Sequence, residues 1–80
     1  MKIPRNLSGK ELIKYLKIYG YSLTRQTGSH IRVTTQMNGE HHITIPNHDP
    51  PKIGTLTSIL DSVATHLQIN KQDLYASLFS

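Results

Sequence analysis

The sequence has no cysteine, few acidic residues and no long apolar run. Without cysteine no disulfide can hold the fold together, which fits a reducing compartment. No apolar run approaches the length that a membrane-spanning helix needs, and the N-terminal residues lack the apolar segment of a secretory signal. Internal repeats, linkers and low-complexity segments are also missing. We therefore expect a cytoplasmic protein that does not contact a membrane and forms a single domain over residues 1–80.

Basic residues outnumber acidic ones. Nine lysines and arginines against five acidic residues give a formal net charge of +4, and the sequence pI is about 9.6. This bias favours an anionic partner, either a nucleic acid or an acidic protein surface. Hydrophobic residues make up 36% of the chain, which is enough for one small core.

A helix is predicted near the N-terminus, over about residues 9–19. Ser8 and Glu11 form a capping-box pattern at its start, and Gly20 supplies a C-terminal stop. The apolar residues recur at helical spacing: Leu12, Ile13, Leu16 and Tyr19. Three lysines share another face and could form a basic ridge for phosphates or an ordinary solvated face: Lys10, Lys14 and Lys17.

The middle of the chain alternates between apolar and polar residues, which is typical of strands. Alternating runs cover residues 21–26, 30–36 and 41–45, and Asn38-Gly39 between the last two is a strong hairpin signal. Three strands adjacent in sequence predict an antiparallel meander. The expected apolar face holds Leu23, Ile31, Val33, Ile43 and Ile45. The expected polar face holds Thr24, His30, Arg32, Thr34, His42 and Thr44.

Two more helices are predicted after a proline-containing loop. Thr55 is the expected N-cap of a helix over about residues 56–67, and Asn70 caps a third that ends near residue 79. The expected buried stripe of the longer helix is Leu56, Ile59, Leu60, Val63 and Leu67. We thus expect an α+β fold of order α-β-β-β-α-α, in which helices cover one face of a three-stranded antiparallel sheet.

His30 directly follows the short reversal Thr27-Gly28-Ser29. A tight turn would fix its position at the mouth of a hairpin and leave it reachable by solvent, which suits a proton-transfer residue. A surface histidine without function is the alternative. On the expected open face this imidazole would lie beside cationic side chains, and such a grouping of titratable and charged residues favours a functional site.

Such a site could cleave RNA. A histidine can take the proton from a ribose 2′-hydroxyl, and the alkoxide then attacks its own 3′-phosphate without a metal ion. His30 would be the base, Arg25 or Arg32 the cation, and the amides around Gly28-Ser29 a phosphate contact. The acid for the leaving oxygen is open among His42, Lys52 and water.

Other chemistries fit the sequence less well. A metal site would have to use His41, His42, His48 and Asp49. Neighbours on a strand point to opposite faces, and no spacing here matches a structural zinc pattern. For the same reason Ser29 is a poor nucleophile for His30. The tyrosines at positions 15, 19 and 21 are expected in the core and at its rim. The open face then has no aromatic platform for bases, which favours reading RNA by backbone and shape.

Several segments follow one another in a characteristic order: Glu11-Leu12-Ile13-Lys14, Gly20-Tyr21, Arg25-Gln26-Thr27-Gly28-Ser29-His30, Ile43-Thr44-Ile45-Pro46-Asn47-His48, Gly54-Thr55-Leu56 and Ile59-Leu60. In this order and approximate spacing they resemble the HicA toxin family over about residues 7–67. The chain departs from many members by continuing to Ser80 with a further helical segment, and His48 follows an asparagine in a proline-rich loop.

The resemblance implies a fold like that of double-stranded-RNA-binding domains and an mRNA interferase, the RNA-cleaving toxin of a bacterial toxin–antitoxin pair. The family's catalytic histidine falls on His30. The implied partners are mRNA and a HicB-type antitoxin that blocks the toxin, without a small-molecule cofactor or metal. The residues expected to contact RNA are Arg25, Gly28, Ser29, Arg32, Lys10, Lys14 and Lys17. The alternatives are a non-catalytic RNA-binding module and a basic protein-interaction domain.

Overall fold

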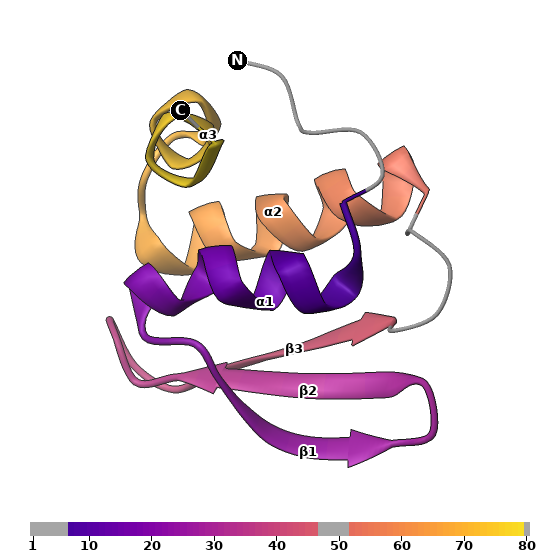
Figure 1. Cartoon of the computed structure of the whole chain (residues 1–80). Coiled ribbons are helices and arrows are strands. Elements are labelled where there is room, and N and C mark those ends of the chain that lie inside the picture. The colour runs from indigo at the N-terminus through magenta and orange to yellow at the C-terminus, as the bar shows by residue number, and fades with distance from the viewer. Residues whose placement is uncertain (1–6, 47–51, 80) are drawn as a thin grey trace.

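A three-stranded sheet lies beneath a layer of helices in the computed structural model, which describes residues 7–46 and 52–79 (Figure 1). The elements in chain order are α1 (Gly9–Leu16), the 3-10 helix η1 (Lys17–Tyr19), β1 (Ser22–Thr27), β2 (His30–Thr35), β3 (His41–Pro46), α2 (Ile53–Leu67) and α3 (Lys71–Phe79). The predicted α+β class and the order α-β-β-β-α-α are confirmed. No helix within the described ranges is long and apolar enough to cross a membrane.

The predicted signals bound α1 and η1. The hydroxyl of Ser8 accepts a hydrogen bond from the amide of Glu11 at 3.1 Å, and the Glu11 carboxylate accepts one from the amide of Ser8 at 3.3 Å. These bonds satisfy amides that a helix start leaves without partners. Gly20, with φ of 80°, ends η1 in the left-handed conformation.

The strands pair antiparallel in the order β1-β2-β3. Thr27 pairs with His30, so only Gly28 and Ser29 connect β1 to β2. Gly28 has a φ of 57°, the positive value that a two-residue hairpin requires at its first loop position. In the next loop Asn38 and Gly39 both have positive φ, as the Asn-Gly signal predicts.

The core lies between the sheet and the helices. Three of the four strand residues expected on the apolar face of β2 and β3 are at most 2% exposed, and Ile43 is 7% exposed. From α2, Leu67 is only half-buried, whereas the rest of its predicted stripe is buried: Leu56, Ile59, Leu60 and Val63. Tyr21, expected in the core or at its rim, is 1% exposed. Tyr15 is more exposed, at 36%.

Two predictions at the edges of this arrangement are wrong. Leu23 is 53% exposed. It lies on the edge strand β1, whose six residues are all exposed and whose pairing with β2 shifts register after Leu23. The second helix begins at Ile53 with Lys52 at the N-cap, so Thr55 lies inside the helix and does not cap it.

The C-terminal segment adds α3 on the side of α1 and α2 away from the sheet (Figure 1). The Oδ1 atom of Asn70 accepts a hydrogen bond from the amide of Asp73 at 2.8 Å, which is the predicted cap. Leu74 and Leu78 are buried. The ring of Phe79 contacts that of Tyr15 edge-on at 5.2 Å between centroids. The segment is thus part of the core.

Candidate functional site

The sheet face opposite the helices is polar. Side chains two residues apart on a strand share a face, so β2 and β3 direct these groups away from the helices. They are His30, Arg32, Thr34, His42 and Thr44. The hydroxyl of Thr24 on β1 joins them, because it contacts the hydroxyl of Thr34 at 2.8 Å. No tyrosine or phenylalanine is found among these groups, so the described part of this face has no stacking platform.

His30 is the first residue of β2 and follows the Gly28-Ser29 turn directly. Its backbone pairs with Thr27 on one side and Pro46 on the other, which fixes its Cα in the sheet. The side chain is exposed, and its imidazole makes no hydrogen bond to another described residue. The backbone therefore sets where the side chain begins, and the exposed ring can reach a bound molecule or water.

Arg25 and Arg32 are cross-strand partners close to this histidine. They oppose one another between β1 and β2, and Arg32 lies two residues after His30 on the same face. Neither arginine forms an ion pair with an acidic group in the described ranges. The Nε atom of Arg32 is enclosed and lacks a hydrogen-bond partner among the described residues. The charges of both arginines therefore stay without an acidic partner in this part of the chain, next to the exposed His30.

The turn itself leaves room for a ligand. A Cβ atom built on Gly28 would have no heavy atom within 4 Å, so the space around this residue is open. Ser29 is half-buried. The backbone of the turn lies beside the exposed His30 and could contact a phosphate there.

The three predicted RNA-binding lysines lie elsewhere. Lys10, Lys14 and Lys17 are all exposed on α1 and η1, in the layer on the other side of the sheet from the open face (Figure 1). Gly9 lies against Pro46, which pairs with His30. Lys10 is therefore at the same end of the molecule as His30, whereas Lys17 is at the far end. The structure does not gather the lysines and His30 on one face.

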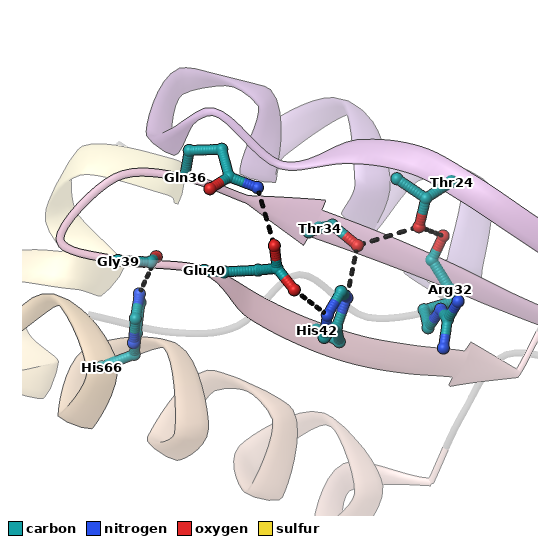
Figure 2. Close-up of polar contacts among 8 residues, drawn as sticks. All are labelled: Thr24, Arg32, Thr34, Gln36, Gly39, Glu40, His42 and His66. Atoms are coloured by element: carbon teal, nitrogen blue, oxygen red, sulfur yellow. Dashed lines mark hydrogen bonds and ion pairs between the residues drawn. The ribbon is translucent and has the colours of Figure 1, made fainter.

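Sequence reasoning missed a hydrogen-bonded chain on the open face. The Nε2 atom of His42 lies 2.8 Å from a Glu40 carboxylate oxygen, and its Nδ1 atom lies 2.7 Å from the Thr34 hydroxyl (Figure 2). Thr34 in turn contacts Thr24. The alternation offered one signal, since Glu40 and His42 are two residues apart. Hydrogen bonds from His42 and Gln36 hold the pKa of Glu40 below its usual value.

Two directions in this chain are defined by the groups themselves. The Thr24 hydroxyl donates to the backbone carbonyl of Arg32 at 3.2 Å. The ionised Glu40 can only accept, so the Nε2 atom of His42 donates to it.

His42 is too far from His30 to act on the same bond. His42 pairs with Thr34, four residues along β2 from His30. At about 3.3 Å per residue this separation is about 13 Å. Of the acids left open above, His42 is therefore not suited to a reaction centred on His30.

The other two described histidines, His41 on β3 and His66 on α2, meet on the helical side of the sheet. The Nδ1 atom of His41 lies 2.8 Å from the Tyr21 hydroxyl, and its ring stacks on that of His66 at 4.3 Å between centroids. His66 donates from Nε2 to the carbonyl oxygens of Met37 and Gly39, both at 2.9 Å, and so holds the β2–β3 loop against α2. Burial, followed by His66 and His42, lowers the pKa of His41. This cluster is structural.

A metal site receives no support from the described residues. His41 and His42 point to opposite faces, as alternation requires. No group of three or more His, Cys, Asp or Glu residues is placed to hold a metal ion in residues 7–46 and 52–79. His48 and Asp49, the other two residues weighed for such a site, lie outside the described residues.

Comparison with known proteins adds one match. The family model described as the HicA toxin of bacterial toxin–antitoxin matches residues 9–64, which run from the start of α1 into the last third of α2 and include the whole sheet. The corresponding comparisons with curated proteins and with solved structures give no match. The family match covers well over half of the chain and leaves out α3. The chain therefore belongs to the HicA toxin family of bacterial toxin–antitoxin systems.

Proposed function

We propose that the chain is an endoribonuclease toxin, an mRNA interferase that uses His30 as its catalytic base. One observation carries this most directly. The exposed imidazole of His30 directly follows a tight turn, on an open sheet face where Arg32 has no acidic partner among the described residues. Membership of the HicA toxin family supports RNA as the target. RNA cleavage needs a base and a cation, and His30 and Arg32 would supply them.

The proposed reaction starts at a ribose 2′-hydroxyl. His30 removes its proton, and the oxygen forms a bond to the adjacent phosphorus while the bond to the 5′-oxygen breaks. The product ends are a 2′,3′-cyclic phosphate and a 5′-hydroxyl, so no water acts as the nucleophile. Arg32, with Arg25 opposite, neutralises charge that develops on the phosphoryl oxygens. Amides of the Gly28-Ser29 turn contact the same phosphate. A group other than His42 protonates the leaving oxygen.

The lysines on α1 would serve a different part of the substrate. Lys10, Lys14 and Lys17 are exposed and lie in the helical layer, so they would contact phosphates away from the cleavage site. Such contacts make binding sensitive to salt and independent of sequence. The same basic surface suits an acidic antitoxin of the HicB type, which would inhibit the toxin by covering His30 or by competing with RNA.

The decisive experiment compares the parent protein with His30→Ala on a single-stranded RNA in the presence of EDTA. We expect cleavage by the parent and a loss of at least 100-fold in the variant, the lower bound for removing a general base. DNA of the same sequence is the matched substrate control and should stay intact, because it has no 2′-hydroxyl.

The outcomes separate the alternatives. Equal cleavage by parent and variant would show that His30 is not the base. Salt-sensitive RNA binding without cleavage by the parent would indicate a non-catalytic RNA-binding module. Weak RNA binding that an acidic protein partner readily displaces would indicate a protein-interaction domain. Circular dichroism of His30→Ala should match the parent, since this side chain is exposed.

A further inference from the structure

A second feature of the open face lies at the end away from His30. It is a groove of about 420 Å³ between the start of β1 and the end of β2. Its lining includes Gly20, Ser22, Thr24, Thr34, Gln36 and Met37. Known small-ligand sites have volumes of about 300–1,000 Å³. The groove is therefore large enough to hold a planar group of a bound molecule.

The chemistry of the lining is neutral. It consists of hydroxyls, an amide, a thioether and a glycine, and none of its described residues carries a charge. A phosphate is bound best by cations or by several amides, which this groove does not offer. The neighbouring Glu40 carboxylate would repel a phosphate. Neutral donors and acceptors beside a flexible apolar side chain suit a nucleobase.

Two polar atoms of the groove remain available. Because the ionised Glu40 only accepts hydrogen bonds, the amide nitrogen of Gln36 faces it, at 3.4 Å, and the carbonyl oxygen of Gln36 is free to accept (Figure 2). The hydroxyl of Ser22 has no hydrogen-bond partner among the described residues. By contrast, Thr24 and Thr34 are already bonded in the chain that ends at Glu40. The groove thus offers one acceptor and one hydroxyl on a fixed wall.

The groove is also aligned with the proposed reaction. Along β2 the outward residues are His30, Arg32 and Thr34, so an arginine lies between the imidazole and the groove. The distance of about 13 Å from His30 to Thr34 corresponds to about four nucleotides at the stacked spacing of about 3.4 Å, and to fewer in an extended strand. One RNA strand can therefore reach both places, with Arg32 on the backbone between them.

We propose that this groove binds one nucleobase of the RNA and gives the toxin a base preference a few nucleotides from the cleaved bond. The proposal rests on the proposed function. The free carbonyl of Gln36 accepts from an N–H on the Watson–Crick edge of a base, and the hydroxyl of Ser22 donates to the acceptor beside it. Every base offers such a pair, so the preference comes from size: a purine buries more apolar surface against Met37 than a pyrimidine does.

The test measures binding in the absence of cleavage. The full chain carrying His30→Ala is titrated with tetra-adenylate and with tetra-uridylate, followed by amide chemical shifts and by fluorescence anisotropy. We expect tighter binding of tetra-adenylate, with shift changes at Ser22 and Gln36. Adding Gln36→Ala or Ser22→Ala should weaken the binding of both oligonucleotides by about 2- to 10-fold, the effect of one hydrogen bond. Gln72→Ala and Ser58→Ala, exposed on α3 and α2, are the matched controls and should change neither affinity.

Equal affinity for the two oligonucleotides, or affinities that Gln36→Ala and Ser22→Ala leave unchanged, would overturn the proposal. The cleavage assay above is read separately. If the parent binds tetra-adenylate through the groove and cuts no RNA, the nuclease assignment fails and the groove assignment stands. If the parent cuts RNA and the groove variants bind as the His30→Ala protein does, the groove assignment alone fails.

Discussion

Gly9 and Gly54 each lie in the first turn of a helix, and replacing each by alanine should change stability in opposite directions. A Cβ atom on Gly9 would overlap the carbonyl oxygen of Pro46 and lie 3.2 Å from Cγ2 of Ile45. Because the closer of these atoms belongs to the backbone of β3, α1 or the end of the strand must move. A Cβ atom on Gly54 would meet no heavy atom within 4 Å.

The magnitudes follow from two opposing effects. Alanine is favoured over glycine in a helix by up to about 1 kcal/mol, partly because it restricts the unfolded chain. Forcing extra volume into a packed site costs about 1–3 kcal/mol. At Gly54 only the first effect operates, so alanine should raise the free energy of unfolding by about 0.5 kcal/mol. At Gly9 the steric cost prevails, and alanine should lower it by about 1–2 kcal/mol.

Urea denaturation followed by circular dichroism measures both variants against the parent. For a domain of this size a loss of about 1 kcal/mol also lowers the melting temperature by about 4–8 °C. If Gly9→Ala were as stabilising as Gly54→Ala, α1 could not lie as close to the end of β3 as the structure places it. Contacts other than that of Gly9 would then have to hold Pro46 opposite His30 in the sheet.

Three further changes test other parts of the fold. Asn70→Ala should lower the free energy of unfolding by about 1 kcal/mol because it removes the cap of α3, and an effect no larger than that of the exposed Gln72→Ala would contradict this. Tyr21→Phe should lower the free energy of unfolding by about 0.5–1.5 kcal/mol through the lost bond to His41. In the parent, burial raises the pKa of this phenol to about 12. An ultraviolet absorbance titration in which all tyrosines ionise at about pH 10 would therefore refute the burial of Tyr21. Because the folded protein lowers the pKa of His41 from 6.5, the unfolded chain takes up this proton first, and stability should fall as the pH drops below 6.5 towards the lowered pKa. Melting temperatures between pH 8 and 5 should show this fall in the parent and a smaller one in His41→Asn; a parent that gains stability on acidification would contradict the sign.

The sequence alone determined the local structure of the chain. The reciprocal bonds of Ser8 and Glu11, the left-handed Gly20 and the cap at Asn70 involve residues within a few positions of one another, so their residue types suffice to predict them. Alternation determined which residues of β2 and β3 share a face, and the Thr27-Gly28-Ser29 reversal placed His30 at an exposed turn. The role of His30 as a base stays a prediction that the cleavage assay tests.

Only the tertiary structure decided which of these local features are covered and which meet. Leu23 follows the apolar pattern of its strand but is exposed, because β1 is an edge strand whose pairing shifts after this residue. The chain from Thr24 through Thr34 and His42 to Glu40 joins three segments, and the stack of His41 on His66 joins β3 to α2. The three lysines of the first helical segment are placed away from the sheet's open face by the packing of that helix. Contacts between residues distant in sequence depend on which strand lies at the edge and on the layer to which each helix packs, and no local pattern encodes these.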